Sequence, residues 1–500
     1  MPLTYSSWEQ VTAWRFLRHR AAVAIGRHSV RLVHDPSKNA VASLLVGAVA
    51  AALTIGVCFL ISVLKPAGLA GGTDQILADR GSAGLYVRVG ETMHPVLNLA
   101  SARLIAGRPD SPKLVPLSQI EKFPMGPTVG IPGAPNDLVV RTSDRAGWGI
   151  CDRLTGSLGA RVQPRVTVLA GMPAVGEWAH EVDSPQAALM GYGGDVYVVS
   201  NGHRSKLDLA DRPVTLALGI TTGGLEIAPM SRALYEALAP TAPLRLPVIP
   251  EARGPVSYAS AELPVVSGSV IRVTDATDTD QFFVALPGGV QPIPGTAAVA
   301  MSNADVSGQG TVVQTDPRTL SELVQTVAID VSMFPPAPVQ LLNKADEPVT
   351  CVLWDRGSGE PQARVRTVSG RRLPIPLDAD RRVITLVSGP EHGSASEVYL
   401  GPDAPNFVQV TGAEAGSSRM ESLWLITDSG VRFGVDTTGS EGKRTREVLG
   451  LAAAPEPAPW SVIRWLPAGP VLSRAAAMSK HDSLVVDRGG VVKPLTEEGR

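Results

Sequence analysis

The sequence predicts an α+β protein, mainly β, in which a single transmembrane helix is followed by a large exported body. One uncharged apolar stretch near the N-terminus predicts the helix. Four related segments in the rest of the chain predict small hairpin/helix modules arranged about a central body. The 50 glycines and 42 prolines of the chain favour short strands joined by tight turns in the exported part.

The apolar stretch runs from Val41 to Leu64 and contains no charged residue. As a helix it would be about 36 Å long, enough to cross a hydrocarbon core of about 30 Å. A segment in lipid must satisfy its own backbone hydrogen bonds, so this one is expected to be helical. Within it, Ser43, Gly47 and Ala51 lie one turn apart, and small residues at this spacing would let a second membrane helix approach closely.

The charges that flank the stretch predict its direction. Six basic residues precede it between Arg15 and Lys38, whereas Lys65 alone follows it closely. Because positive charge is retained on the cytoplasmic side, the N-terminus is expected inside and the body, from about Pro66, outside. A cleaved signal peptide is the alternative, but its apolar region would be about 7 to 15 residues long and would follow a shorter basic start.

A basic amphipathic helix is predicted from Trp8 to Val33, just before the membrane segment. The apolar residues at helical spacing are Trp14, Leu17, Ala21, Ala24 and Ile25, with arginines among them. A helix of this kind either lies on the anionic leaflet of a membrane or docks on a partner protein.

The three cysteines divide between the two parts of the chain. Cys58 falls within the membrane segment and is interpreted as a small apolar packing residue. Cys151 and Cys351 are both exported, and two thiols in an oxidising compartment favour a disulfide, with buried free thiols as the alternative. Closing a loop of about 200 residues would stabilise the fold by roughly 5 kcal/mol and would join the first and last thirds of the exported part.

Four segments of the exported part share one layout: 84–102, 195–212, 281–298 and 423–439. Each contains an aromatic strand, a glycine turn, a second strand, and a turn or helix-capping residue eleven or twelve positions after the aromatic. The aromatic and capping landmarks are Tyr86 and Asn98, Tyr197 and Asp208, Phe283 and Pro294, and Trp424 and Asp436. The layout predicts hairpins that each feed a helix or loop, and unequal spacing favours modules around a central body. Unrelated hairpins of an ordinary β-rich chain are the alternative.

These features predict the following division of the chain. Residues 1–40 hold the cytoplasmic basic helix, 41–64 the transmembrane helix, 65–122 the first repeat, 123–194 the first part of the central domain, 195–240 the second repeat, 241–280 a linker and central segment, 281–330 the third repeat, 331–412 the second part of the central domain, 413–484 the fourth repeat and C-terminal segment, and 485–500 a flexible tail. Short helices are expected from Ser231, as N-cap, to Ala239, and from Lys443 to Leu449, where Gly450 stops the helix.

The sequence contains no motif that predicts an active site. In the nearest approach to a phosphate-binding loop, 437–445, Gly442-Lys443 is followed by Arg444 where Ser or Thr is needed. His180-Glu181 lacks the second histidine of a zinc protease helix. A formal net charge of −2 argues against nucleic acid as a partner. We therefore expect no catalytic residue, no metal and no cofactor.

Several motifs of unusual composition occur in order along nearly the whole chain. They are VTAWRFLRHR from Val11, HDP from His34, KPAG from Lys65, LYVRVGETMHPVLNLASARLIAG from Leu85, FPMGPTVGIPGAP from Phe123, Cys151-Asp152, HRSKLDLADR from His203, SRALYEAL from Ser231, Cys351-x-x-Trp354, VRFGV from Val431 and GPVLSRAAA from Gly469. In these motifs the chain resembles the EccB family, the single-pass core component of mycobacterial type VII (ESX) secretion systems.

The resemblance implies an elongated periplasmic body, with four repeat domains around a central domain and one disulfide, which would fall on Cys151 and Cys351. It also implies a place in the inner membrane with EccC, EccD and EccE, of which EccC is the ATPase motor, and export of WXG100, PE and PPE substrates. Members of the family often carry an ATPase label of their own. ATP is expected for this chain only through that label, because no nucleotide motif supports it.

Three functions therefore compete. A structural core component would anchor and assemble the secretion machinery in the membrane and could self-associate. An ATPase in the exported part and a peptidoglycan-binding module are the alternatives. The first function accounts for the basic helix, the anchor and the exported body, whereas the other two account for the exported body alone.

Overall fold

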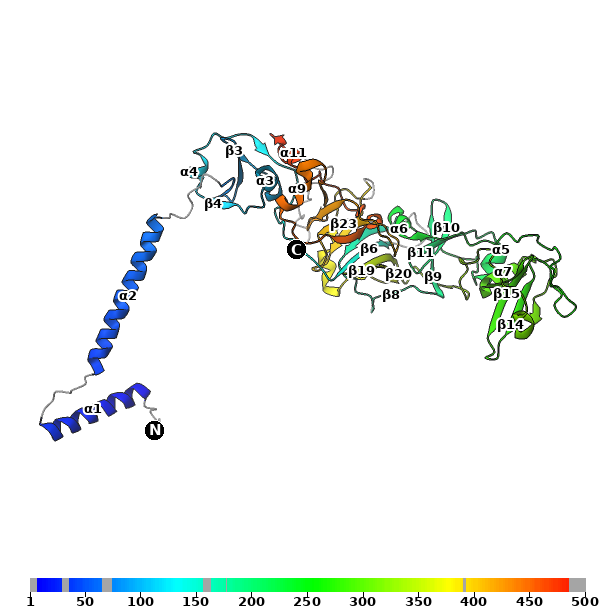
Figure 1. Cartoon of the computed structure of the whole chain (residues 1–500), viewed down its shortest axis with the longest axis horizontal. Helices are drawn as coiled ribbons and strands as arrows, with labels where there is room; N and C mark the ends of the chain where they lie inside the picture. Colours follow the sequence, from blue (N-terminus) through cyan, green and yellow to red (C-terminus); the bar gives the residue numbers. More distant parts are fainter. Residues whose placement is uncertain are drawn as a thin grey trace, which may run out of the picture.

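The computed structural model describes residues 7–28, 36–64, 74–155, 163–176, 178–389 and 393–484. Two long helices precede the body and lie apart from it (Figure 1). α1 (Trp8–Arg27) begins at a capping box between Ser7 and Gln10 and ends at His28, whose φ of 49° is left-handed. The helix thus ends before the predicted Val33, and the remainder of that prediction lies outside the described residues.

α2 (Pro36–Leu64) contains the predicted membrane segment and begins five residues before it. Its window Ala42–Leu60 is, within the described residues, the one helical stretch long and apolar enough to cross a membrane, and none of it is buried inside the protein. This bare apolar surface fits a helix surrounded by lipid. The close approach of a second helix along Ser43, Gly47 and Ala51 stays a prediction.

A seven-stranded sheet forms the centre of the body, in the order β21-β22-β7-β6-β19-β20-β8. Its strands are β6 (Arg145–Arg153), β7 (Arg165–Ala170), β8 (Ala179–Glu181), β19 (Val349–Gly357), β20 (Arg364–Gly370), β21 (Ile384–Thr385) and β22 (Glu397–Leu400), with the 3₁₀ helix η1 (Leu377–Arg382) beside them. The two central strands, β6 and β19, pair antiparallel along their whole length. They approach closely at Gly149, where a Cβ atom would lie 2.6 Å from Cδ2 of Leu353.

Each of the four repeats folds into the same unit. Three antiparallel strands are followed by a helix, and a fourth strand returns parallel to the first, so the order in each sheet is third, second, first, fourth. A second helix then follows on the other face. The first repeat has β1 (Ile76–Asp79), β2 (Leu85–Val89), β3 (Thr92–Pro95), α3 (Leu99–Ala106), β4 (Lys113–Val115) and α4 (Leu117–Ile120), and the second has β9 (Gln186–Tyr192), β10 (Asp195–Ser200), β11 (His203–Leu207), α5 (Arg212–Ala217), β12 (Ala228–Pro229) and α6 (Arg232–Ala237).

The third repeat has β14 (Val270–Thr274), β15 (Asp280–Leu286), β16 (Gly289–Ile293), α7 (Gly295–Asn303), β17 (Val313–Thr315) and α8 (Pro317–Ser321), and the fourth has β23 (Phe407–Thr411), β24 (Leu423–Ile426), β25 (Arg432–Val435), α9 (Gly439–Leu449), β26 (Glu456–Pro459) and α10 (Trp460–Ile463). Short pieces complete the body: β5 (Thr128–Val129), β13 (Ala239–Pro240), β18 (Gln340–Leu341), α11 (Arg474–Ala477) and β27 (Lys480–His481). All four predicted hairpins are present, and each is followed by a helix.

The boundaries of the last three repeats differ from the prediction. The first strands β9, β14 and β23 lie before residues 195, 281 and 413, in segments that the sequence assigned to the central domain or a linker. Within the described residues, no strand between 241 and 280 joins the central sheet, so the central segment predicted there is wrong. The aromatic landmarks lie on the second strands and not on the first, and the loop between the first and second strands varies in length, from residues 193–194 to residues 412–422. The spacing of residues along the sequence therefore could not identify the first strands as parts of the repeats.

The repeats pack in two pairs, one toward each end of the body, with the central sheet between the pairs. The face of the first repeat that carries α3 shares an apolar core with the face of the fourth that carries α9. In the same way, the second and third repeats share a core between α5 and α7. Along the body, Figure 1 shows the first repeat, the fourth, the central sheet, the second and the third in that order. The result is an elongated body with α2 before its first repeat.

Candidate functional site: the joint between the repeats and the central sheet

A disulfide bond lies at the middle of the central sheet. Cys151 on β6 and Cys351 on β19 are directly opposite each other, with Cα atoms 4.0 Å apart, and both side chains are fully buried. The bond lies on one face of the sheet, in an apolar cluster with Val349, Val368 and Tyr399 of the same face. It joins residues separated by 200 positions in the sequence. The second and third repeats therefore lie within the loop that it closes.

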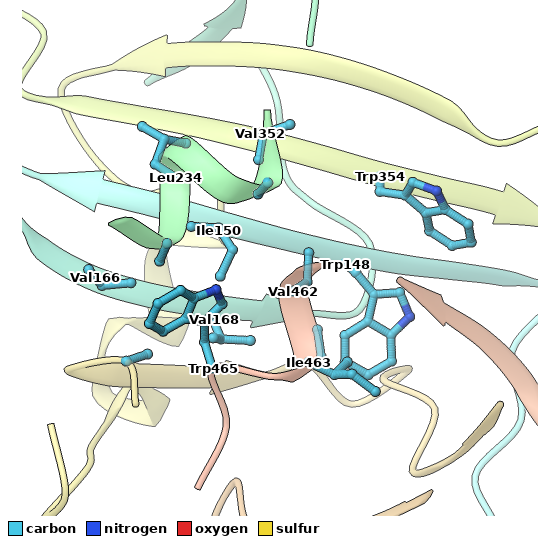
Figure 2. Packing of buried hydrophobic residues seen from close by; sticks show 14 of the residues in the cluster. Trp148, Ile150, Val166, Val168, Leu234, Val352, Trp354, Val462, Ile463 and Trp465 are labelled. Atoms are coloured by element: carbon cyan, nitrogen blue, oxygen red, sulfur yellow. The ribbon is translucent and has the colours of Figure 1, made fainter. Parts of the chain in front are cut away.

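The opposite face of the sheet receives helices from two repeats (Figure 2). Trp148 and Ile150 on β6, Val352 and Trp354 on β19, and Val166 and Val168 on β7 form one apolar core with Leu234 of α6 and with Val462 and Ile463 of α10. The indole N–H of Trp148 donates to the carbonyl of Pro457 on β26, at 3.1 Å. An ion pair of 3.0 Å between Arg464 and Glu236 joins α10 to α6 directly. The second and fourth repeats are thereby fixed to one face and to each other.

The sequences of the second helices explain which repeats dock here. α6 buries Ala233, Leu234 and Ala237, and α10 buries Val462 and Ile463, so each presents an apolar side to the sheet. In contrast, α8 of the third repeat buries Leu320 alone and presents Arg318, whose side chain is 90% exposed. α4 of the first repeat buries Ile120 alone. Helices that bury so little apolar surface can face solvent instead of docking on the sheet. This is consistent with the places of the first and third repeats at the two ends of the body.

A buried polar joint connects the central sheet to α6. Asp152 on β6 is 1% exposed, and its carboxylate accepts hydrogen bonds from the Ser231 amide at 2.7 Å and the Ser231 hydroxyl at 2.6 Å. Ser231 in turn caps α6 by accepting from the amide of Leu234, at 3.1 Å. Burial raises the pKa of Asp152 to about 7, against the opposing effects of the Ser231 hydrogen bonds and the Lys344 charge.

Lys344 is the cation of this joint. It is 5% exposed, and its ammonium donates to the carbonyl of Val349 at 3.0 Å and to the hydroxyl of Ser369 at 2.8 Å. Burial lowers its pKa to about 8, against the opposing effects of Glu347 and Asp152. Two titratable groups at one joint make the stability of the body sensitive to pH.

The joint predicts a specific pH dependence. The pKa of Asp152 is higher in the folded protein, about 7, than its ordinary value of 3.8. Its contribution to stability is therefore complete below about pH 4 and is lost as the pH rises to about 7, by at most about 4 kcal/mol. Asp152→Asn, which keeps the shape of the side chain, is expected to remove this slope. Urea unfolding midpoints of wild type and variant between pH 4 and 8 measure it; parallel curves would contradict the assignment.

Ion pairs connect the strands of the central sheet to one another. Arg145 on β6 pairs with Asp355 on β19 at 2.7 Å, and Arg366 on β20 pairs with the same carboxylate at 3.2 Å. Glu181 on β8 pairs with Arg364 on β20 at 2.6 Å. Four adjacent strands are thus connected through side chains as well as through their backbones. Arg366 and Asp355 are the most buried pair of this network, so loss of either partner would leave a buried charge uncompensated.

The residues that come nearest to nucleotide- and zinc-binding motifs lie within regular secondary structure. Gly442 and Lys443 lie inside the continuous helix α9, where the Gly442 amide donates to the carbonyl of Thr438 at 3.0 Å and is not directed at a ligand. His180 lies on β8, 3.8 Å from Glu347. Within the described ranges, no group of three His, Cys, Asp or Glu residues is placed to hold a metal ion. A surface cavity of 390 Å³ lies between the first and fourth repeats and is lined by Leu99, Arg103 and Gly450 among others.

The capping landmarks of the repeats lie in turns or at helix N-termini, and the aromatic landmarks lie on the second strands. Asn98 caps α3 by accepting from the amide of Ser101, at 3.0 Å. Asp208 and Asp436 accept from amides two residues ahead, at 2.9 Å each, and form the turns that lead into α5 and α9. Pro294 precedes α7 without a side-chain cap. Among the aromatic landmarks, Tyr197 and Phe283 are buried, whereas Tyr86 and Trp424 are half-buried.

The residues of the joint itself were not singled out as functional from the sequence. Asp152 and Lys344 are isolated charges in ordinary surroundings, and their burial depends on strands far apart in the chain. The signal that was present is the charge of Asp152 within the apolar run of β6, directly after a cysteine. A charge in such a place must be paired or hydrogen-bonded.

Known proteins are similar to this chain over nearly its whole length. A family model described as type VII secretion system ESX-1, transport TM domain B, matches residues 3–486. The ESX-5 secretion system ATPase EccB5 of Mycobacterium tuberculosis is 39% identical over 490 residues, covering 97% of this chain and 95% of the relative. The ESX-3 secretion system ATPase EccB3 of Mycolicibacterium smegmatis is 37% identical, covering 95% of this chain and 90% of the relative.

Solved structures are similar over most of the chain as well. A chain of an intact ESX-5 inner membrane complex is 36% identical, with a TM-score of 0.76 and 99% coverage of both chains. A chain of an EccB3 dimer from the ESX-3 core complex is 35% identical, with a TM-score of 0.72, covering 81% of this chain and all of that one. At these identities the similarity extends to family as well as fold.

Proposed function

The chain belongs to the EccB family of type VII secretion proteins, and from this premise we propose that it is a structural core component of an ESX-type inner-membrane complex. The observation that carries the proposal is the joint itself. A disulfide and ion pairs connect the strands of the central sheet, two helices dock the second and fourth repeats on it, and the apolar helix α2 precedes the body. This arrangement suits a body that presents fixed surfaces to other subunits.

The proposal includes a sidedness. α2 would cross the inner membrane with α1 in the cytoplasm and the body in the periplasm, because the basic residues precede the apolar stretch. A disulfide bond also fits an oxidising compartment such as the periplasm, where disulfides form and persist. In that position the chain would anchor and help assemble the translocation machinery for small helical substrates of the WXG100, PE and PPE kinds.

The partners proposed for it are EccC, EccD and EccE, together with a second copy of itself. Self-association is supported by the relative solved as a dimer and by the exposed apolar surface of α2, on which Ser43, Gly47 and Ala51 lie. Affinity isolation of the tagged chain from its own membrane in mild detergent, followed by mass spectrometry, tests the proposal. Recovery together with the three other membrane components is expected, whereas a chain that purifies alone would contradict it.

An ATPase function is the second candidate, since the names of the relatives contain that word. The glycine and lysine nearest to a phosphate-loop pattern lie within α9, so Lys443 has no phosphate site to serve. We predict that Lys443→Ala leaves ATP hydrolysis by the purified chain unchanged, at the level of a mock preparation. Hydrolysis that is well above the mock and abolished by Lys443→Ala would support the ATPase instead. Peptidoglycan binding by the repeats stays a further prediction, and sedimentation with purified peptidoglycan tests it.

A further inference from the structure

The helix α1 is a long element that the rest of the described protein leaves uncovered. None of its residues is buried. Its aromatic and aliphatic side chains are open to the surroundings: Trp8 is 83% exposed, Trp14 57%, Leu17 61% and Ile25 76%. Two tryptophans on a capped helix of 20 residues would be costly to leave in water. A covering surface is therefore needed.

One side of α1 carries an apolar stripe, while Trp8, Phe16 and Val23 lie on the other side of the helix. Trp14, Leu17, Ala21 and Ile25 follow one another at spacings of three and four residues, which puts them on one side of the helix. Arg18 lies at the edge of this face, with its guanidinium carbon 4.7 Å from the centre of the Trp14 ring. Its aliphatic stem can thus cover apolar surface while its charge stays at the rim.

The charged residues of α1 are mostly positive. Four arginines, Arg15, Arg18, Arg20 and Arg27, are opposed by Glu9 alone. The helix ends at Arg27 and α2 begins at Pro36, so the connecting residues can span at most about 30 Å. If α2 lies in a bilayer, α1 cannot move far from the surface of that bilayer.

From these observations we infer that α1 docks on the membrane surface that adjoins α2, and that it recognises anionic lipid headgroups through its arginines. The apolar face of α1 lies at the boundary between headgroups and acyl chains, where tryptophan side chains partition favourably. The arginines lie at the level of the headgroups, where a negative surface attracts them. This inference requires only that α2 spans the membrane, and it does not depend on the proposed role in secretion.

The test uses the full chain in vesicles. In a Cys58→Ser, Leu17→Cys variant, an environment-sensitive fluorophore labels position 17 alone, because Cys151 and Cys351 are joined and buried. Vesicles of phosphatidylcholine with phosphatidylglycerol should give blue-shifted emission that lipid-borne quenchers reduce. Vesicles of phosphatidylcholine alone should give a much weaker effect, and salt raised to about 1 M should diminish the difference.

Charge variants make the test quantitative. Arg15→Gln and Arg20→Gln should each lower the ratio of docked to undocked α1 about fivefold in the anionic vesicles, and Glu9→Gln should raise it by a similar factor. Arg318→Gln, at an exposed arginine on the body, is the matched control and should change nothing. Emission that is the same in both kinds of vesicle, or that is unchanged by the Arg15→Gln and Arg20→Gln substitutions, would overturn the inference. Protection of the label only in the isolated multi-protein complex would assign the helix to a protein partner and would overturn it too.

Discussion

Replacing both Cys151 and Cys351 by alanine is expected to lower the free energy of unfolding of the body by about 5 kcal/mol. The bond closes a loop of 200 residues, so its loss restores much conformational freedom to the unfolded chain. An ordinary domain is stable by only about 5 to 15 kcal/mol, so this is a large fraction of the total. Denaturant unfolding of the full chain in detergent, without reductant and followed by tryptophan fluorescence, measures the change.

The third cysteine supplies the control. Cys58 lies in α2, outside the body, so Cys58→Ala should leave the unfolding midpoint of the body unchanged. Strong reductant during unfolding should bring the wild-type midpoint down to that of the double variant and leave the double variant where it is. Equal midpoints for wild type and double variant without reductant would show that the bond contributes no stability.

Trp148→Ala is expected to have the second largest effect, a loss of about 3 to 5 kcal/mol. The side chain is 2% exposed and lies between the central sheet and α10, so its removal leaves a cavity at the joint. It also leaves the carbonyl of Pro457 on β26 without its indole donor. We expect the fourth repeat to detach locally, which hydrogen exchange would report as faster exchange at the amides of Arg464 and Trp465, since these donate to the carbonyls of Trp460 and Val462.

A graded series separates packing from hydrogen bonding at Trp148. Trp148→Phe keeps most of the buried apolar area and loses the bond to Pro457, so a smaller loss of about 1 to 3 kcal/mol is expected. Trp8→Ala, at an 83% exposed position in α1, should not affect the body. If Trp148→Ala behaved like Trp8→Ala, the docking of the fourth repeat could not depend on this residue.

The sequence was most informative where a local pattern decides the structure. The apolar stretch in α2, the four hairpins, the N-cap at Ser231 and the left-handed stop at Gly450 all follow from short-range chemistry, and each is present. α9 nevertheless begins at Gly439, four residues before the predicted Lys443, because its first turn is polar and shows no apolar periodicity.

Long-range pairing was the part that the sequence could not supply. The first strand of each repeat has no landmark of its own, and the fourth strand is short, as in β12 (Ala228–Pro229). Both are defined by the neighbours that they meet in the sheet. The burial of Asp152 and Lys344 depends in the same way on β6, β20 and α6 coming together. No spacing rule along one strand predicts such a meeting.

The most direct test of the account is the sidedness of the native chain. An epitope before Trp8 and a second epitope after Leu484 can be followed while protease is added to intact spheroplasts. We predict that the second epitope and the body are cut, that the first epitope survives until the membrane is lysed, and that the large fragments stay linked through Cys151 and Cys351 until reductant is added. A body that resists protease in intact spheroplasts and is cut only after lysis would contradict the account.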